Sequence, residues 1–209
     1  MVQHPSSPEI GEIERLQHRI ERDPADTEAS VRLGALLYEP GHQPEQAIEV
    51  LRREVDRDPS SGDAKFWLAY CLWMEYHATE EAASLLESAL RADPDRPDCL
   101  TILGSVRREQ GRPPEECVPL VERAVRVAPD WIAPREQLAT LYLEMSRFDE
   151  AEAEATRALS LISQVEVPPG SIEEFELVVT GRMRSRGPST LELLIDRIRR
   201  ARQVAAKAR

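Results

Sequence analysis

The sequence has few of the features that mark secreted, disulfide-bonded or membrane proteins. Among its 209 residues are three cysteines, Cys71, Cys99 and Cys117, an odd and widely spaced set that does not suit a disulfide framework. No run of 18 apolar residues is present, and the first residues lack the basic start and apolar stretch of a signal peptide. We therefore expect a soluble, cytoplasmic protein that does not insert into a membrane.

Positive charge is scarce over most of the chain. Asp and Glu number 38 against 27 Lys and Arg, a formal net charge of −11. Residues 181–209 hold nine basic and two acidic residues, a charge of +7, so residues 1–180 carry −18. A nucleic-acid backbone would be repelled by so acidic a chain, and we expect no nucleic-acid partner.

Residues with catalytic or metal-binding potential are scattered. The four histidines and three cysteines show no ligand spacing, and no glycine-rich phosphate loop is present. The acidic pairs Glu80-Glu81 and Glu115-Glu116 open predicted helices, where negative charge is stabilising without any chemistry. We therefore predict no enzymatic activity, no metal site and no cofactor.

What the sequence does contain is a period of 35 residues. Leucines recur at this spacing, and each is followed by Gly or Ala, which allows two helices to approach closely. A proline recurs with the same step and ends a helix, because the residue before proline is disfavoured in the α conformation. These columns are Leu33, Leu68, Leu103 and Leu138; Gly34, Ala69, Gly104 and Ala139; and Pro24, Pro59, Pro94 and Pro129.

Each repeat unit contains two amphipathic helices. The first carries apolar residues at i, i+3 and i+4, as in Leu33, Leu36 and Leu37, and the second carries a similar stripe, as in Ile48, Leu51 and Val55. Helix pairs of this length, with Leu-Gly/Ala, a later Ala and a closing Pro, resemble tetratricopeptide repeats. The resemblance covers residues 10 to about 163 and implies an all-α, right-handed superhelical solenoid of stacked antiparallel helix pairs.

The two ends of the chain are expected to cap this solenoid. We predict a flexible tail over 1–8, a lone helix over 9–22, a linker over 164–171, and a divergent C-terminal helix pair with a basic tail over 172–209. The basic final helix is interpreted as the solvated face of a cap, with contact to lipid or to a partner helix as the alternative. The repeat units are predicted over about 25–59, 60–94, 95–129 and 130–163.

Aromatic residues make up only 5% of the chain, but half of them gather on one predicted helix. Residues 66–76 contain five of the ten, and residues 66–74 are apolar without interruption. Leu68 and Leu72 are expected to face the core, which leaves the opposite face of the helix as a binding surface. The predicted partner-binding groove comprises Tyr38, Glu39, Phe66, Tyr70, Trp73, Met74, Arg108, Glu109, Thr140, Leu143 and Glu144.

The resemblance and this surface together predict a protein-interaction module or scaffold. Its partner would be a peptide or helix, apolar with basic flanks, because carboxylates such as Glu39, Glu109, Glu136 and Glu144 are expected beside the aromatic residues. Two alternatives remain open. One is an acidic regulator or inhibitor, antitoxin-like or immunity-like, that masks a basic protein; the other is a structural subunit that forms a homo-oligomer through residues 66–74.

Overall fold

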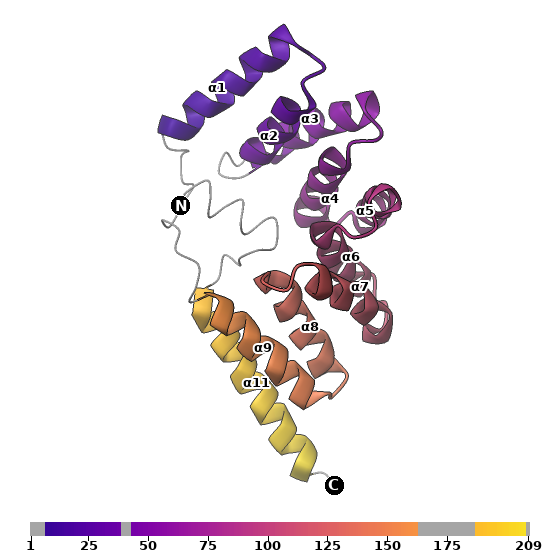
Figure 1. Ribbon diagram of the computed structural model, residues 1–209, viewed down its shortest axis with the longest axis vertical. Helices are drawn as coiled ribbons and strands as arrows, with labels where there is room; N and C mark the ends of the chain where they lie inside the picture. Colours follow the sequence, from indigo (N-terminus) through magenta and orange to yellow (C-terminus); the bar gives the residue numbers. More distant parts are fainter. Residues whose placement is uncertain (1–6, 39–42, 163–186, 208–209) are drawn as a thin grey trace. The chain divides into compact units, whose positions relative to one another are not determined.

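The described part of the chain, residues 7–38, 43–162 and 187–207 of a computed structural model, is built from α-helices (Figure 1). The chain divides into two compact units, residues 1–94 and 95–209. The first unit contains α1 (Ser7–Arg22), α2 (Thr27–Tyr38), α3 (Pro44–Arg57), α4 (Gly62–Tyr76) and α5 (Thr79–Ala92). The second contains α6 (Pro97–Glu109), α7 (Pro114–Val127), α8 (Ile132–Glu144), α9 (Phe148–Ile162) and α11 (Gly187–Lys207).

Consecutive helices form the pairs that the period predicts. In the first unit α2 pairs with α3 and α4 with α5, and α4 also packs against α3. In the second unit α6 pairs with α7 and α8 with α9, and α8 packs against α7. We call α2, α4, α6 and α8 first-type helices and α3, α5, α7 and α9 second-type helices.

The proline column ends helices as predicted. The second-type helices α3, α5 and α7 stop two residues before Pro59, Pro94 and Pro129. Pro119 lies inside α7, which nevertheless continues to Val127. Proline has no N–H, so the helical hydrogen bond to the carbonyl of Glu115 is not made.

The small-residue column brings the two helices of a pair into close contact. A Cβ atom added to Gly34 would lie 2.5 Å from Cγ of Leu51 in α3, and one added to Gly104 would lie 2.7 Å from Cγ2 of Val121 in α7. Ala69 in α4 is completely buried at the equivalent position. An alanine at either glycine would therefore force the facing side chain, Leu51 or Val121, to shift.

Polar side chains at the start of two first-type helices bind within their own pair. The Lys65 ammonium, almost fully buried, donates a 2.9 Å hydrogen bond to Oγ of Ser88 in α5. The Arg135 guanidinium donates to the carbonyl oxygen of Pro129 and forms a 2.7 Å ion pair with Glu154 in α9. Lys65 and Arg135 are two periods of 35 residues apart, so they hold equivalent positions in their pairs.

The helix α1 covers the first pair. Leu16 is buried with 2% of its surface exposed, and α1 packs against α2. The Arg19 guanidinium pairs with Asp26 at 2.9 Å, while Asp26 Oδ1 accepts a 2.9 Å hydrogen bond from the backbone N–H of Ala29 in the first turn of α2. This backbone hydrogen bond, together with the Arg19 contact, lowers the pKa of Asp26.

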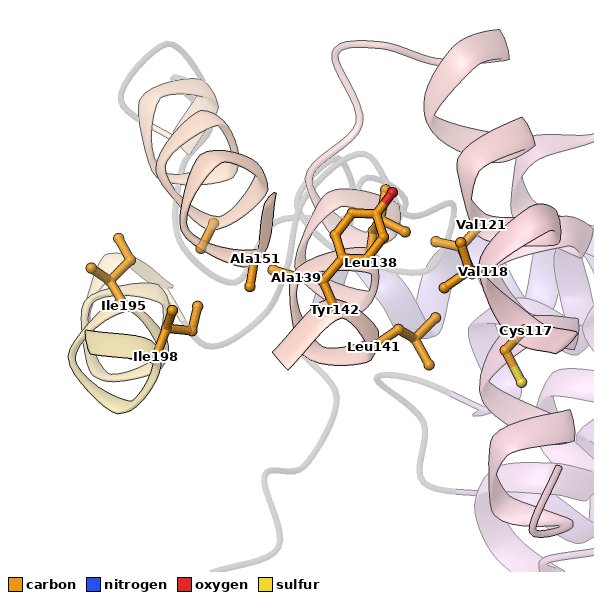
Figure 2. Packing of buried hydrophobic residues seen from close by; sticks show 11 residues of the cluster. Cys117, Val118, Val121, Leu138, Ala139, Leu141, Tyr142, Ala151, Ile195 and Ile198 are labelled. Atoms are coloured by element: carbon orange, nitrogen blue, oxygen red, sulfur yellow. The ribbon is translucent and has the colours of Figure 1, made fainter. Parts of the chain in front are cut away.

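At the other end of the chain, α11 packs on α9 and α8 (Figure 1). Ile195 and Ile198 point from α11 toward Ala151 of α9 and the core of the second unit (Figure 2). The sequence predicts a helix start near Ser189, and α11 begins at Gly187. The predicted linker and the first helix of the predicted C-terminal pair lie outside the described residues.

Candidate functional site

Four aromatic side chains of α4 form a continuous row of ring contacts, which we call the aromatic row: Phe66, Trp67, Tyr70 and Trp73. Tyr70 lies at the centre, with ring centroids 6.3 Å from Phe66, 6.2 Å from Trp67 and 6.4 Å from Trp73. Trp67 also meets Phe66 edge-on at 5.7 Å. Such edge-to-face contacts hold the rings in fixed orientations.

The row extends to the neighbouring first-type helix through Tyr38. Its ring meets Tyr70 edge-on at 5.7 Å, and its hydroxyl donates a 2.8 Å hydrogen bond to Oε1 of Glu75. Burial, and then this hydrogen bond, raise the pKa of Tyr38 well above its ordinary value. The α2 and α4 helices are thereby joined beside the aromatic row.

Exposure within the row differs from the sequence-based expectation. Phe66 is 2% exposed and Tyr38 is 5% exposed. Both were predicted to contact a partner, but neither side chain is accessible to one. Tyr70 and Trp73 are half-buried, and Met74 is 45% exposed. Phe66 and Tyr38 therefore support the surface rather than form it.

Trp67 was not among the predicted groove residues, but it belongs to the accessible face. Trp67 is half-buried, and Tyr70 and Met74 follow it at i+3 and i+7, so the three residues lie on one side of α4. The spacing of Trp67, Tyr70 and Met74 is visible in the sequence. The prediction places Phe66, one residue earlier, on the outer face of the helix and therefore omits Trp67. Trp67, Tyr70 and Met74 make up what we call the α4 face.

In the second unit, two predicted groove residues bind each other. The Arg108 guanidinium donates to Oε1 of Glu144 through Nε at 2.9 Å and Nη2 at 2.6 Å, joining α6 to α8. Glu136, expected beside the groove, is 5% exposed and does not present its carboxylate to solvent. The predicted acidic character of this surface is thus reduced in the second unit.

The other predicted groove residues occupy varied environments. Thr140 donates a 3.0 Å hydrogen bond to the carbonyl oxygen of Glu136, one helical turn earlier. Leu143 is half-buried against the core of the second unit, and Glu109 is exposed near the end of α6. Glu39 lies outside the described residues.

The remaining titratable groups form no metal-binding cluster in the described part of the chain. Within residues 7–38, 43–162 and 187–207 no group of three His, Cys, Asp or Glu is placed to hold a metal ion, and no helix is long and apolar enough to cross a membrane. The three cysteines are fully buried, and burial raises the pKa of the Cys117 thiol. An open pocket of about 580 Å³ lies between α9 and α11, but its acidic groups Asp149 and Glu152 pair with Arg202.

A comparison with protein families identifies the repeat. Residues 35–75 and 79–130 match a family described as tetratricopeptide repeat. These two stretches carry tetratricopeptide repeats. The family resemblance predicted from the 35-residue period is confirmed, and no curated protein matches the chain.

Solved structures show the same tetratricopeptide fold. The crystal structure of MamA has 23% sequence identity over 73% of this chain and 87% of its own, with a TM-score of 0.60. TTC0263, a thermophilic TPR protein of Thermus thermophilus, has 21% sequence identity over 87% of this chain and 89% of its own, with a TM-score of 0.63. YrrB, described as a TPR protein with an unusual peptide-binding site, has 19% sequence identity over 94% of this chain and 98% of its own, with a TM-score of 0.60. The predicted fold of stacked helix pairs is confirmed.

Proposed function

We propose that this tetratricopeptide-repeat chain is a protein-interaction module that binds a peptide or helix of another protein on the α4 face. The observation that carries the proposal is the aromatic row, in which half-buried rings are held by ring contacts and backed by buried Phe66 and Tyr38. Ordered aromatic side chains lose little conformational entropy when a partner packs on them, and they are frequent anchors of protein interfaces.

The exposed residues around the α4 face favour an apolar partner segment with a basic flank. Met74 adds a flexible apolar side chain that adapts to different partner shapes. Asp63 and Glu75 are exposed near the two ends of α4 and supply negative potential there. A positively charged flank of the partner would be attracted to these carboxylates.

The similarity to YrrB agrees with this proposal. That protein is described as having a peptide-binding site, and it shares the tetratricopeptide fold with this chain along most of both sequences. At this identity the similarity concerns the fold, so the choice of residues rests on the α4 face of this chain.

The proposal is tested by affinity purification with quantitative mass spectrometry. We expect Trp67→Ala and Tyr70→Ala each to reduce partner recovery at least about tenfold, since anchor residues of an interface contribute roughly 2 kcal/mol or more. Tyr76→Ala is the matched control, because Tyr76 is 54% exposed on a different side of the same helix. Helical content measured by circular dichroism shows whether each variant remains folded.

Two results would contradict this assignment. One is unchanged partner recovery by a folded Trp67→Ala, Tyr70→Ala double variant. The other is that the wild type, like every variant, loses the partner in about 0.5 M salt, where charges are screened within a few ångströms. That second result would instead favour masking of a basic protein by the acidic chain.

A further inference from the structure

The helix α11 occupies the position of a first-type helix that has no second-type partner among the described residues. Within each unit, the first-type helix that follows another pair packs on that pair's second-type helix and, more lightly, on its first-type helix. In the first unit α4 does so with α3 and α2, and in the second unit α8 does so with α7 and α6. The contacts of α11 with α9 and α8 follow this pattern.

The side of α11 that faces away from α9 carries exposed apolar residues. Leu193 is 66% exposed and Val204 is 68% exposed, while Leu191 and Ile198 are buried on the other side. Arg197 and Arg200 lie between Leu193 and Val204 on the same stripe, at i+4 and i+7. An aliphatic and basic stripe is thus left on the helix.

The helix α1 is the complementary case, a second-type helix with no first-type partner among the described residues. Leu16 and Ile20 lie 35 residues before Leu51 and Val55 of α3, so α1 has the register of a second-type helix. In this register Glu12 stands in the column of Ala47, Ala82 and Cys117, which is fully buried in the complete pairs. Glu12 is instead half-buried and pairs with the exposed Arg15 at 2.7 Å.

The charges of α1 and α11 match when the two helices run antiparallel, as paired helices do. The first half of α1 is acidic and its last turn is basic, with Arg19 and Arg22. The first half of α11 contains Glu192 and Asp196, and its second half is basic. An antiparallel pair would therefore place Glu12 near Arg200 and the basic end of α1 near the acidic start of α11.

We propose that α11 of one copy pairs with α1 of a second copy, so that the two unpartnered helices complete each other. This contact is independent of the α4 face. A contact between two α11 helices is disfavoured, because a two-fold axis would place Arg197 and Arg200 against their own equivalents. Pairing of α11 with α1 uses two different surfaces, so each copy can bind one further copy through α1 and another through α11, and association increases with concentration.

The same exposed stripe could attract an anionic membrane, but its composition favours a protein. Leu193 and Val204 are three turns apart, with arginines between them and no aromatic residue on the exposed stripe. Two separate aliphatic side chains bury too little apolar area for stable insertion between lipids. A second helix, in contrast, covers both aliphatic residues and pairs with the arginines.

The test is analytical ultracentrifugation of the full chain from about 1 μM to about 1 mM, a range that covers weak to moderate affinities. We expect the average mass of the wild type to rise with concentration. Glu12→Lys and the double variant Arg197→Glu, Arg200→Glu should each weaken association at least tenfold. Glu14→Lys is the matched control, since Glu14 is exposed on the opposite side of α1 and the change in charge is the same.

Mixing the two weakened variants distinguishes a head-to-tail contact from other contacts. An equimolar mixture of the Glu12→Lys protein and the Arg197→Glu, Arg200→Glu protein should associate again. The unchanged α11 of the first can bind the unchanged α1 of the second, and the two altered helices can form an ion pair of reversed sign. A wild type that stays monomeric throughout overturns the proposal, as does a mixture that fails to associate. Equal weakening by Glu14→Lys also overturns it, as does a wild type that binds anionic vesicles but does not self-associate without them.

Discussion

The hydroxyl of Tyr142 donates a 2.7 Å hydrogen bond to Oε1 of Glu122, which joins α8 to α7 within the second unit. Burial, and then this hydrogen bond, raise the pKa of Tyr142 to about 12. The Arg147 guanidinium lies 4.3 Å from the centre of the same ring. One phenol therefore connects a second-type helix to the first-type helix that follows it.

This relationship predicts a stability change in alkaline solution. Because the pKa of Tyr142 in the folded chain lies above that of an unfolded tyrosine, about 10, its contribution is complete below pH 10 and is lost as pH rises through about 12. Tyr142→Phe should lower the free energy of unfolding by about 1 kcal/mol at neutral pH. Urea denaturation of both proteins at neutral and alkaline pH measures this; an equal difference at both pH values would contradict it.

The close contact at Gly34 predicts that even one methyl group destabilises the first unit. In Gly34→Ala the new Cβ would lie 2.5 Å from Leu51 Cγ, and Leu51 is completely buried. We expect a loss of about 1–3 kcal/mol in urea denaturation. Gly11→Ala is the control, because nothing lies within 4 Å of its added Cβ; it should stabilise α1 by about 0.5–1 kcal/mol.

Two turns between paired helices of the second unit contain a residue in the left-handed region, and only one of these residues is glycine. Gly111 has φ 77° and Ser146 has φ 60° at corresponding turns of the second unit. Ser146→Gly should raise the free energy of unfolding by about 0.5–1 kcal/mol, since a side chain is disfavoured in this conformation. Gly111→Ala should lower it by a similar amount, and thermal unfolding of the two variants should shift in opposite directions.

The packing of α11 predicts an asymmetry between its two sides. Ile198→Ala removes a fully buried side chain from the core of the second unit and should cost about 2–5 kcal/mol. Leu193→Ala, on the exposed side, should change the free energy of unfolding by less than about 0.5 kcal/mol. Hydrogen exchange of α9 and α11 reports the effect locally, and similar exchange in both variants would contradict the arrangement.

The sequence was sufficient to predict the helix pairs because the repeated columns carry the packing. Leucine, a small residue and a closing proline recur at one step, and each has a local physical role that does not depend on distant contacts. The same reasoning predicted the close approach at Gly34 and Gly104. Side-chain pairs such as Arg108 and Glu144 are harder to predict from the sequence, because long polar side chains can reach several neighbours on an adjacent helix.

The accessible face of α4 was predicted only in part for a related reason. Residues 66–74 are apolar throughout, so the pattern contains no polar residue that marks the solvent side. One residue corresponds to a rotation of about 100° around a helix, which is enough to exchange Phe66 for Trp67. Which of the two is buried depends on the neighbouring helices.

The order of the helices along the chain has a consequence for biosynthesis. The apolar side of α9 includes Ala158 and Leu161, and part of the core around them is supplied by Leu191 of α11. During synthesis α9 is complete well before α11, because residues 163–186 are made between them. The apolar side of nascent α9 therefore stays without the cover of Leu191 until α11 is made, and exposed apolar surface of this kind is prone to aggregation.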